Sequence, residues 1–367
     1  MNEQQIVTLT KGLDAVKSNK GRIFFLTLDT KGLAKAAIAY NYEMVKALND
    51  LGFDAYIMHE KADYQSVESW LGKEMSSLPH VSIESKEVKV QISDLVIIPE
   101  VFGHVLEQTK EMPCEKMIFC QSYDYIFETL PPGMTWPAYN VHRCITTSEK
   151  QGEMITSMMP NVEVNNIKMF IPDYFKKSEK PQIPMIAVHT RDARDTHKII
   201  KGFYVKFPQY KWITFRDLRN LSREKFAEDL SNSCIAVWVD DESGFGTFPL
   251  EAMKCGIPVI GKVPNLAPEW IDEKNGIWTY EYNKIIDVLG SFVNKWLEDE
   301  VPTELYEEMG KTVEPYTKEN FIDSVNTLFN NIMTRKEKEI RIQLEKLTPV
   351  GPQDNIEKGS VSELYNN

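Results

Sequence analysis

The chain has 367 residues, of which 42% are hydrophobic, and a formal net charge of −12. This length suits two globular domains. Residues 1–170 carry 16 basic and 22 acidic side chains and residues 171–367 carry 26 and 32, so each part has a net charge near −6. Because non-specific binding of nucleic acid needs clustered Lys and Arg, this even acidity argues against a nucleic-acid partner, although it leaves room for a local basic groove.

Other features of the composition point to a cytoplasmic protein. We expect no transmembrane segment, because no stretch contains 18 uncharged apolar residues. The N-terminal sequence lacks the basic start and apolar core of a secretion signal. Five cysteines at irregular spacing predict neither a disulfide framework nor a structural zinc site.

The first half alternates apolar runs with helical patterns. Runs typical of buried strands occupy 22–28, 54–59, 94–102, 116–120 and 142–147. A helical spacing of apolar residues follows the first run and stops at Gly52, and Ser148 is placed to cap a helix over 149–158. We predict an N-terminal Rossmann-like, acceptor-side domain over residues 1–172.

The segment 173–184 is rich in proline and lysine, has no periodicity, and is predicted to be a linker. The alternation then restarts, with strands predicted over 185–190, 211–215, 234–239, 258–261 and 276–280. Strands alternating with helices in both halves predict the α/β class, with two Rossmann-like parallel-sheet domains facing a cleft and C-terminal helices. The second domain is expected over 185–333, followed by a helix and loose tail over 334–367.

The run DDESGFGTFPLEAMKCGIPVIG, from Asp240 to Gly261, follows one of these strands. Pro249 suits a first helical turn and Gly256 suits the position after a helix end. Gly244 and Gly246 therefore come at the start of a helix, where free backbone N–H groups and the helix dipole favour an anion such as phosphate. The alternative is a tight turn whose glycines adopt positive φ.

This run resembles the retaining glycosyltransferases of the GT-B fold, above all family 4, over roughly residues 183–333. Family members typically show FG, P, LEAMACG, PVI and a downstream PE. The matching residues here are Phe245-Gly246, Pro249 to Met253, Cys255-Gly256, Pro258 to Ile260 and Pro268-Glu269. The resemblance implies a nucleotide-sugar donor and transfer with retention, without a metal or other cofactor. The acceptor would be a glycan, a lipid-linked molecule or a small molecule.

The resemblance also implies roles for charged side chains. In the family an Arg and a Lys after the first strand of the second domain hold the diphosphate, and we assign Arg191 and Lys198, with Arg194 as the rival of Arg191. Glu251 matches the glutamate that accepts hydrogen bonds from the ribose hydroxyls. Without the resemblance, the alternative for the segment from Arg191 to Lys198 is a charged loop that caps a helix.

The loop itself is expected to line the donor site. Gly246 and Thr247 would offer backbone N–H groups to the phosphate, Gly244 would allow its close approach, and Phe245 would flank the donor sugar. The family usually has an acidic residue two positions before this Phe, where the chain has Ser243. Either Glu242 takes that role or the sugar is held differently.

Candidates in the first domain are weaker. Gly32 follows the first strand, where family members often have paired glycines beside the donor phosphate. His104, Tyr123 and Asp124 lie after later strands, where an acceptor would bind. The alternatives to a transferase are a non-catalytic sugar-nucleotide or glycan-binding protein of the same fold and, more narrowly, a transferase acting on modified DNA bases.

Overall fold

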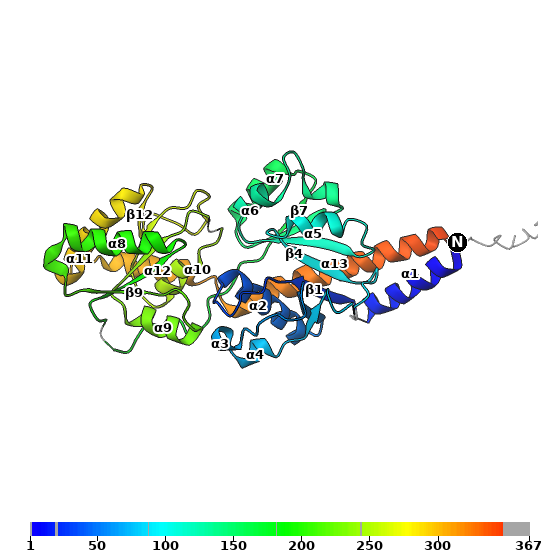
Figure 1. Ribbon diagram of the computed structural model, residues 1–367, viewed down its shortest axis with the longest axis horizontal. Helices are drawn as coiled ribbons and strands as arrows, with labels where there is room; N and C mark the ends of the chain where they lie inside the picture. Colours follow the sequence, from blue (N-terminus) through cyan, green and yellow to red (C-terminus); the bar gives the residue numbers. More distant parts are fainter. Residues whose placement is uncertain (1, 19–20, 87, 181, 243, 348–367) are drawn as a thin grey trace, which may run out of the picture.

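The computed structural model describes residues 2–18, 21–86, 88–180, 182–242 and 244–347, and these form two lobes, each built around a parallel sheet (Figure 1). The α/β class with two parallel-sheet domains is therefore confirmed. The predicted tail over 348–367 lies outside the described residues, as does Ser243. Within the described ranges, no helix combines the length and apolarity needed to cross a bilayer.

The first sheet has the strand order β3-β2-β1-β4-β5-β6-β7, with parallel neighbours throughout. Its strands are β1 (Arg22–Leu26), β2 (Asp54–His59), β3 (His80–Ser82), β4 (Leu95–Pro99), β5 (Glu115–Cys120), β6 (Arg143–Thr146) and β7 (Glu163–Asn166). Every residue of β4 is buried, as expected for a central parallel strand that helices cover on both faces.

The helices of this domain include one that the sequence analysis missed, α1 (Asn2–Lys17). The others are α2 (Ala36–Asp50), α3 (Glu68–Leu71), α4 (Lys73–Ser76), α5 (Gly103–Gln108), α6 (Asp124–Thr129) and α7 (Glu149–Met158), with a 3-10 helix at Trp136–Tyr139. Ser148 is the N-cap residue of α7, as predicted, but its side chain makes no bond to its own helix.

The second sheet has the order β12-β11-β10-β8-β9. Its strands are β8 (Met185–Thr190), β9 (Thr214–Asp217), β10 (Ile235–Val239), β11 (Val259–Lys262) and β12 (Ile277–Thr279). Its helices are α8 (Ala193–Lys206), α9 (Arg223–Asn232), α10 (Thr247–Lys254), α11 (Ile285–Leu297) and α12 (Thr303–Val313), with 3-10 helices at Pro208–Tyr210 and Tyr282–Lys284.

The last helix, α13 (Lys318–Leu347), returns to the first domain and packs along α1 and α2 (Figure 1). Its Phe329 ring lies 6.5 Å from Phe25 of β1, and its buried Lys336 donates to the carbonyl of Asp94 at 2.7 Å. The domain boundary expected after residue 333 therefore falls inside one continuous helix. The apolar face of α13 continues past residue 333 because the helix packs against the first domain there.

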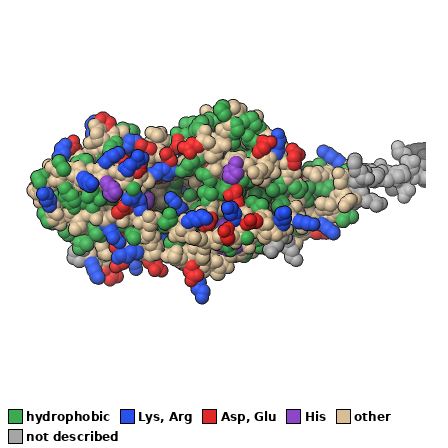
Figure 2. Space-filling model, viewed as in Figure 1, with side chains coloured by type: hydrophobic (Ala, Val, Ile, Leu, Met, Phe, Trp, Pro, Cys, Tyr) green, Lys and Arg blue, Asp and Glu red, His purple; other side chains and the backbone are tan. Residues whose placement is uncertain are grey.

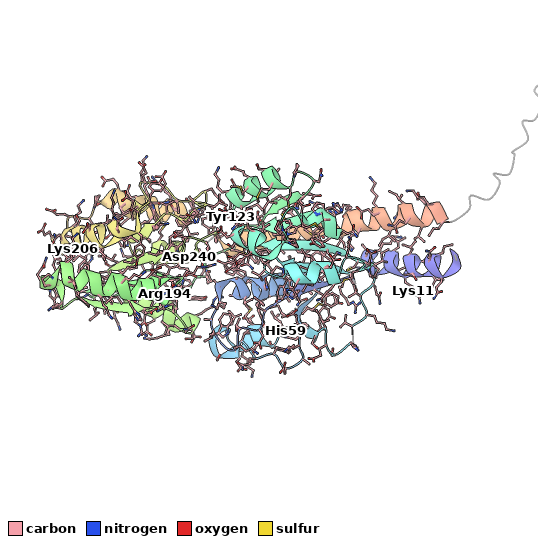
Figure 3. All side chains as sticks on the ribbon, turned by 45° about the horizontal axis from the view of Figure 1, so that its top comes forward. Lys11, His59, Tyr123, Arg194, Lys206 and Asp240 are labelled. Carbon is pink, nitrogen blue, oxygen red and sulfur yellow. The ribbon has the colours of Figure 1, made fainter. Side chains whose placement is uncertain are left out.

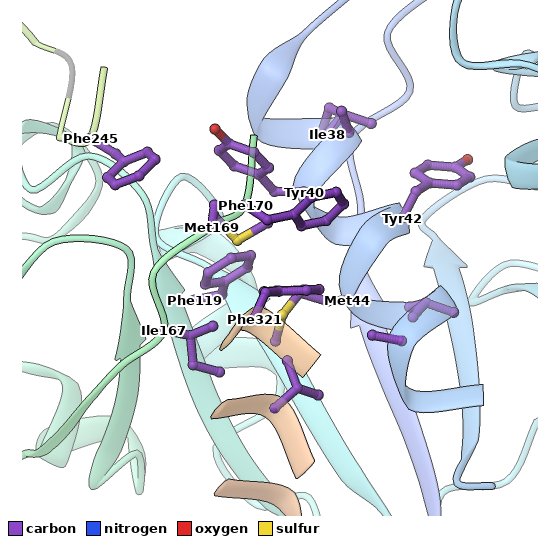
Figure 4. Close-up of a cluster of buried hydrophobic side chains, with 14 of the residues drawn as sticks. Ile38, Tyr40, Tyr42, Met44, Phe119, Ile167, Met169, Phe170, Phe245 and Phe321 are labelled. Carbon is purple, nitrogen blue, oxygen red and sulfur yellow. The ribbon is translucent and has the colours of Figure 1, made fainter. Parts of the chain in front are cut away.

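The two domains also meet through a continuous hydrophobic cluster. Phe170, in the segment that leads to the second domain, lies 5.1 Å from Phe321 of α13 (Figure 4). Phe245, from the loop before α10, lies beside the same region. The carboxyl ends of both sheets face this junction, which is where parallel α/β domains place their ligands.

Candidate active site

The loop between β10 and α10 packs against two tryptophans, Trp238 and Trp270. Gly246 is the N-cap residue of α10, with φ of 71°, and a Cβ there would lie 3.0 Å from Trp238 and 3.1 Å from Trp270. The Trp270 indole N–H donates to the carbonyl of Phe245 at 2.7 Å. These contacts fix the position at which α10 begins. The first backbone N–H groups of the helix, including that of Thr247, have no acceptor within the helix.

Gly244 is a glycine for a different reason from the one expected. A Cβ at this position would lie 1.2 Å from the Gln151 side-chain nitrogen and 2.4 Å from the carbonyl oxygen of Gln121. Both residues belong to the first domain, and Gln151 itself donates to that carbonyl at 2.8 Å. The missing side chain at 244 thus lets the loop lie directly against the first domain.

The ring of Phe245 is buried. The side chain is 4% exposed and makes an edge contact with Tyr316, with ring centroids 5.4 Å apart. The ring of Phe245 therefore belongs to the hydrophobic cluster between the domains, and its expected place beside the donor sugar stays a prediction.

Arg191 lies at the carboxyl end of β8 and contacts both domains. Its guanidinium is 2.6 Å from the Glu242 carboxylate and 3.5 Å from Asp240. It also donates to the Tyr125 hydroxyl of the first domain at 2.8 Å. Glu242 is thus turned toward Arg191, and its carbonyl accepts from the Ser122 hydroxyl at 2.7 Å.

The other two predicted cations, Arg194 and Lys198, lie on α8. Arg194, whose side chain is 82% exposed, binds Asp192, the residue that caps the helix. Lys198 pairs with Asp195 at 3.1 Å and lies over the Tyr282 ring at 5.6 Å. Among the residues that the structure describes, no contact joins Lys198 to Arg191.

Glu251 lies on α10, one turn after the helix start, and faces the first domain. Burial raises the pKa of its carboxyl to about 7, against the lowering effect of Arg223. Arg223, the first residue of α9, pairs with Glu43 of α2 at 2.9 Å. Within the described chain the Tyr40 hydroxyl is buried without a partner, and its pKa is raised by burial and then by Glu251.

Of the first-domain candidates, Asp124 is the one that the structure brings to Arg191. Burial and then Glu242 raise the pKa of its carboxyl, while Arg191 lowers it. Tyr123 precedes it and makes an edge contact with Phe127 at 6.0 Å. Figure 3 shows Tyr123 and Asp240 where the two lobes face each other, and Figure 2 shows a hollow between the lobes in the same region.

The remaining first-domain candidates have other neighbours. His104, at the start of α5, lies 3.2 Å from the Glu60 carboxylate. Gly32 adopts φ of 76° in the turn after β1, and a Cβ there would lie 3.4 Å from the side-chain oxygen of Gln65. Gly32 therefore makes a tight turn, and no described contact links it to α10.

Sequence reasoning missed several residues of this junction. Tyr125 lies one position after a named candidate, but nothing in its local sequence shows that Arg191 is its partner. Arg223 could have been noticed as a cation at a helix start after a strand. Trp270 directly follows the Pro268-Glu269 pair, a position at which a buried indole could have been expected to support the loop.

Comparisons with known proteins add to this geometry. No protein-family model matches the chain. An alpha-1,6-glucosyltransferase from Actinobacillus pleuropneumoniae is 25% identical over 269 residues, covering 69% of this chain and 79% of that protein.

Solved structures share the fold. Sucrose-phosphate synthase from Thermosynechococcus elongatus superposes with a TM-score of 0.61 at 13% identity, covering 86% of this chain and all of that one. HepE from Anabaena, in complex with UDP and glucose, superposes with a TM-score of 0.59 at 12% identity, again covering 86% of this chain and all of that one. The chain thus shares the GT-B fold of these solved structures, and its sequence is similar to that of a glucosyltransferase.

Proposed function

We propose that the chain transfers a sugar from a nucleotide-sugar donor to an acceptor hydroxyl, with retention of the anomeric configuration and without a metal ion. The observation that carries this proposal is the start of α10. There a loop fixed by Trp270 leaves helix N-terminal N–H groups at the domain junction, and Glu251 follows one turn later. The first feature suits a diphosphate and the second a ribose.

Arg191 is the proposed cation for the leaving diphosphate. When the sugar–phosphate bond breaks, its electron pair stays with the nucleoside diphosphate, and the added negative charge needs a fixed positive partner. Arg191 is held at the junction by groups from both domains, whereas the exposed Arg194 is bound to Asp192, the N-cap residue of α8. Lys198 is proposed as a second cation, whose flexible stem must first leave Asp195.

Glu242 is the proposed replacement for the family's acidic residue at Ser243. Its carboxylate points into the junction beside Arg191 and Asp124. A carboxylate there can accept hydrogen bonds from sugar hydroxyls once the diphosphate takes over Arg191. Tyr123 and Asp124, across the junction, remain the proposed acceptor-side residues.

The relatives suggest which donor to test first. The solved HepE contains UDP and glucose, and the Actinobacillus protein is named as an alpha-1,6-glucosyltransferase. UDP-glucose is therefore the first donor to test, with a glucan or glucoside as the first acceptor. A cytoplasmic location, as expected from the sequence, gives access to such donors.

Turnover tests this proposal directly. The protein is incubated with UDP-glucose, other nucleotide sugars and a panel of glycan, lipid-linked and small-molecule acceptors, with EDTA present. We expect release of UDP and, by NMR, a product with the anomeric configuration of the donor. An inverted product contradicts retention, and activity that chelation abolishes and Mn²⁺ restores contradicts metal independence. Binding without turnover across the panel favours a non-catalytic binding protein, and transfer to modified DNA alone favours the narrower alternative.

Replacing the two arginines separates their roles. Arg191→Ala should lower kcat by about 10²–10³, as for loss of one oxyanion donor, because charge grows on the diphosphate during bond cleavage. Donor Kd should change less. Arg194→Ala, three residues further along the chain in the first turn of α8, is the matched control and should leave kcat within about twofold of wild type. A large loss of kcat in Arg194→Ala with a normal Arg191→Ala would reverse the assignment.

The raised pKa of Glu251 predicts that donor binding depends on pH. An ionised carboxylate can accept from both ribose hydroxyls, so affinity for UDP-glucose should weaken as the pH falls from 8 to 6, through the pKa of about 7. At pH 8, Glu251→Gln should weaken donor binding at least about tenfold, because a hydrogen bond to a charged group contributes roughly 1.5–3 kcal/mol. Isothermal titration at several pH values measures both effects.

The control for this titration is Glu100→Gln. Burial also raises the pKa of Glu100 to about 7, but its carboxylate accepts from the backbone N–H of Ser122 in the first domain. This variant should keep the pH dependence that Glu251→Gln removes. A pH profile that is unchanged in Glu251→Gln would place Glu251 outside the ribose site.

A further inference from the structure

Glu269, the acidic residue of the Pro268-Glu269 pair, belongs to the second domain but caps a helix of the first. One of its carboxylate oxygens accepts from the Ser148 hydroxyl at 2.8 Å and from the backbone N–H of Glu149 at 3.1 Å. These residues open α7, and the Ser148 side chain makes no capping bond to its own helix. A carboxylate at a helix N-terminus is stabilised both by the free N–H groups and by the helix dipole.

The neighbouring residue, Trp270, fixes the loop that precedes α10. Its indole N–H holds the Phe245 carbonyl, and its ring limits the space at Gly246. Two adjacent residues, Glu269 and Trp270, thus contact different parts of the protein. Glu269 binds the acceptor-side domain, and Trp270 sets the loop proposed to bind the donor phosphate.

The same helix α7 also contacts that loop directly. Gln151, one turn after Ser148, lies against Gly244 and leaves no room for a side chain there. The first turn of α7 therefore meets the segment of Glu269 and Trp270 on one side and the loop before α10 on the other. A shift of either second-domain segment changes the surface that α7 docks against.

We infer that Glu269 and Trp270 are positioning residues that couple the conformation of the donor-phosphate loop to the closure of the two domains. The inference rests on the proposed function for its catalytic consequence, but the closure itself is a property of the protein alone. Neither side chain needs to touch the substrate. Glu269 acts through α7, and Trp270 acts through the Phe245 carbonyl and Gly246.

The test combines kinetics with an interdomain distance. The chain's five cysteines are all buried, so spin labels can be directed to introduced cysteines at the exposed positions Ser157 of α7 and Lys201 of α8. Double electron–electron resonance then reports the separation of α7 from the second domain, with and without UDP. The label pair is introduced into wild type, Glu269→Ala, Trp270→Phe and the control Glu273→Ala, which removes an exposed glutamate nearby.

For Glu269→Ala we expect a broader and longer distance distribution, kcat lowered about tenfold, and a UDP-glucose Kd within about twofold of wild type. Trp270→Phe keeps an aromatic ring but removes the donor to Phe245, so donor Kd should rise several-fold. Glu273→Ala should match wild type in all three measurements. If Glu269→Gln restores most of the wild-type distance distribution, the hydrogen bonds accepted by the side-chain oxygen, rather than its charge, hold α7.

A wild-type distance distribution in Glu269→Ala would overturn the inference, as would a loss of donor affinity equal to the loss in kcat. These outcomes can be told apart from failure of the proposed function. If no donor is turned over by wild type, the transferase proposal fails, while the distance distributions still decide whether Glu269 holds the domains together. If Trp270→Phe does not fold, Glu269→Ala decides the question, because its side chain is half-buried rather than part of the core.

Discussion

The loop between β10 and α10 has to fit two surfaces at once, and this constraint organises the junction. On one side it must present the N–H groups at the start of α10, which requires positive φ at Gly246 and close packing on Trp238 and Trp270. On the other side it lies against Gln121 and Gln151, which requires a glycine at 244. The two glycines thus have different roles. Gly246 allows the backbone conformation at the start of α10, where an anion is proposed to bind, and Gly244 allows close contact with the first domain.

Several carboxylates share one cation, Arg191, at the junction. Arg191 is surrounded by Asp240, Glu242 and Asp124, and burial raises the pKa of both aspartates. Carboxylates in such a place are costly unless they have a partner. An entering diphosphate would compete for Arg191 and free Glu242, whose next available partners are the hydroxyls of the sugar. If Arg191 moved to the diphosphate, its contact with Tyr125 of the first domain would change as well. Donor binding and the contact between the domains would therefore both depend on Arg191.

Much of the fold follows from local patterns, and the exceptions have physical causes. Buried strands such as β4 and β10 are continuous apolar runs, and the helix from Glu149 to Met158 carries its signals within a few residues. The short strands β3 and β7 lie at sheet edges and lack such runs, so they were missed. The crossing of α13 could not be predicted, because helical periodicity shows that a stripe is apolar but not which domain covers it.

The site was predictable to a similar degree. The positions of Gly246, Thr247 and Glu251 at the start of α10 follow from strand, loop and helix signals that lie within about one turn of each other. The partners of Arg191 and Arg223 do not, because Tyr125 and Glu43 are far away in sequence and meet them only when the domains pack. The burial of Phe245 could not be predicted for the same reason, since it depends on Tyr316 from the segment before α13.

The most direct test of this account is a crystal structure of the chain with UDP bound. We expect the β-phosphate within hydrogen-bond distance of the backbone N–H groups of Gly246 and Thr247. We also expect the Arg191 guanidinium to contact the diphosphate and both ribose hydroxyls to donate to the Glu251 carboxylate. The ordered bond from Trp270 to the Phe245 carbonyl should be retained. UDP bound elsewhere, or bound here with its ribose away from Glu251 and its phosphates away from the start of α10, would contradict it.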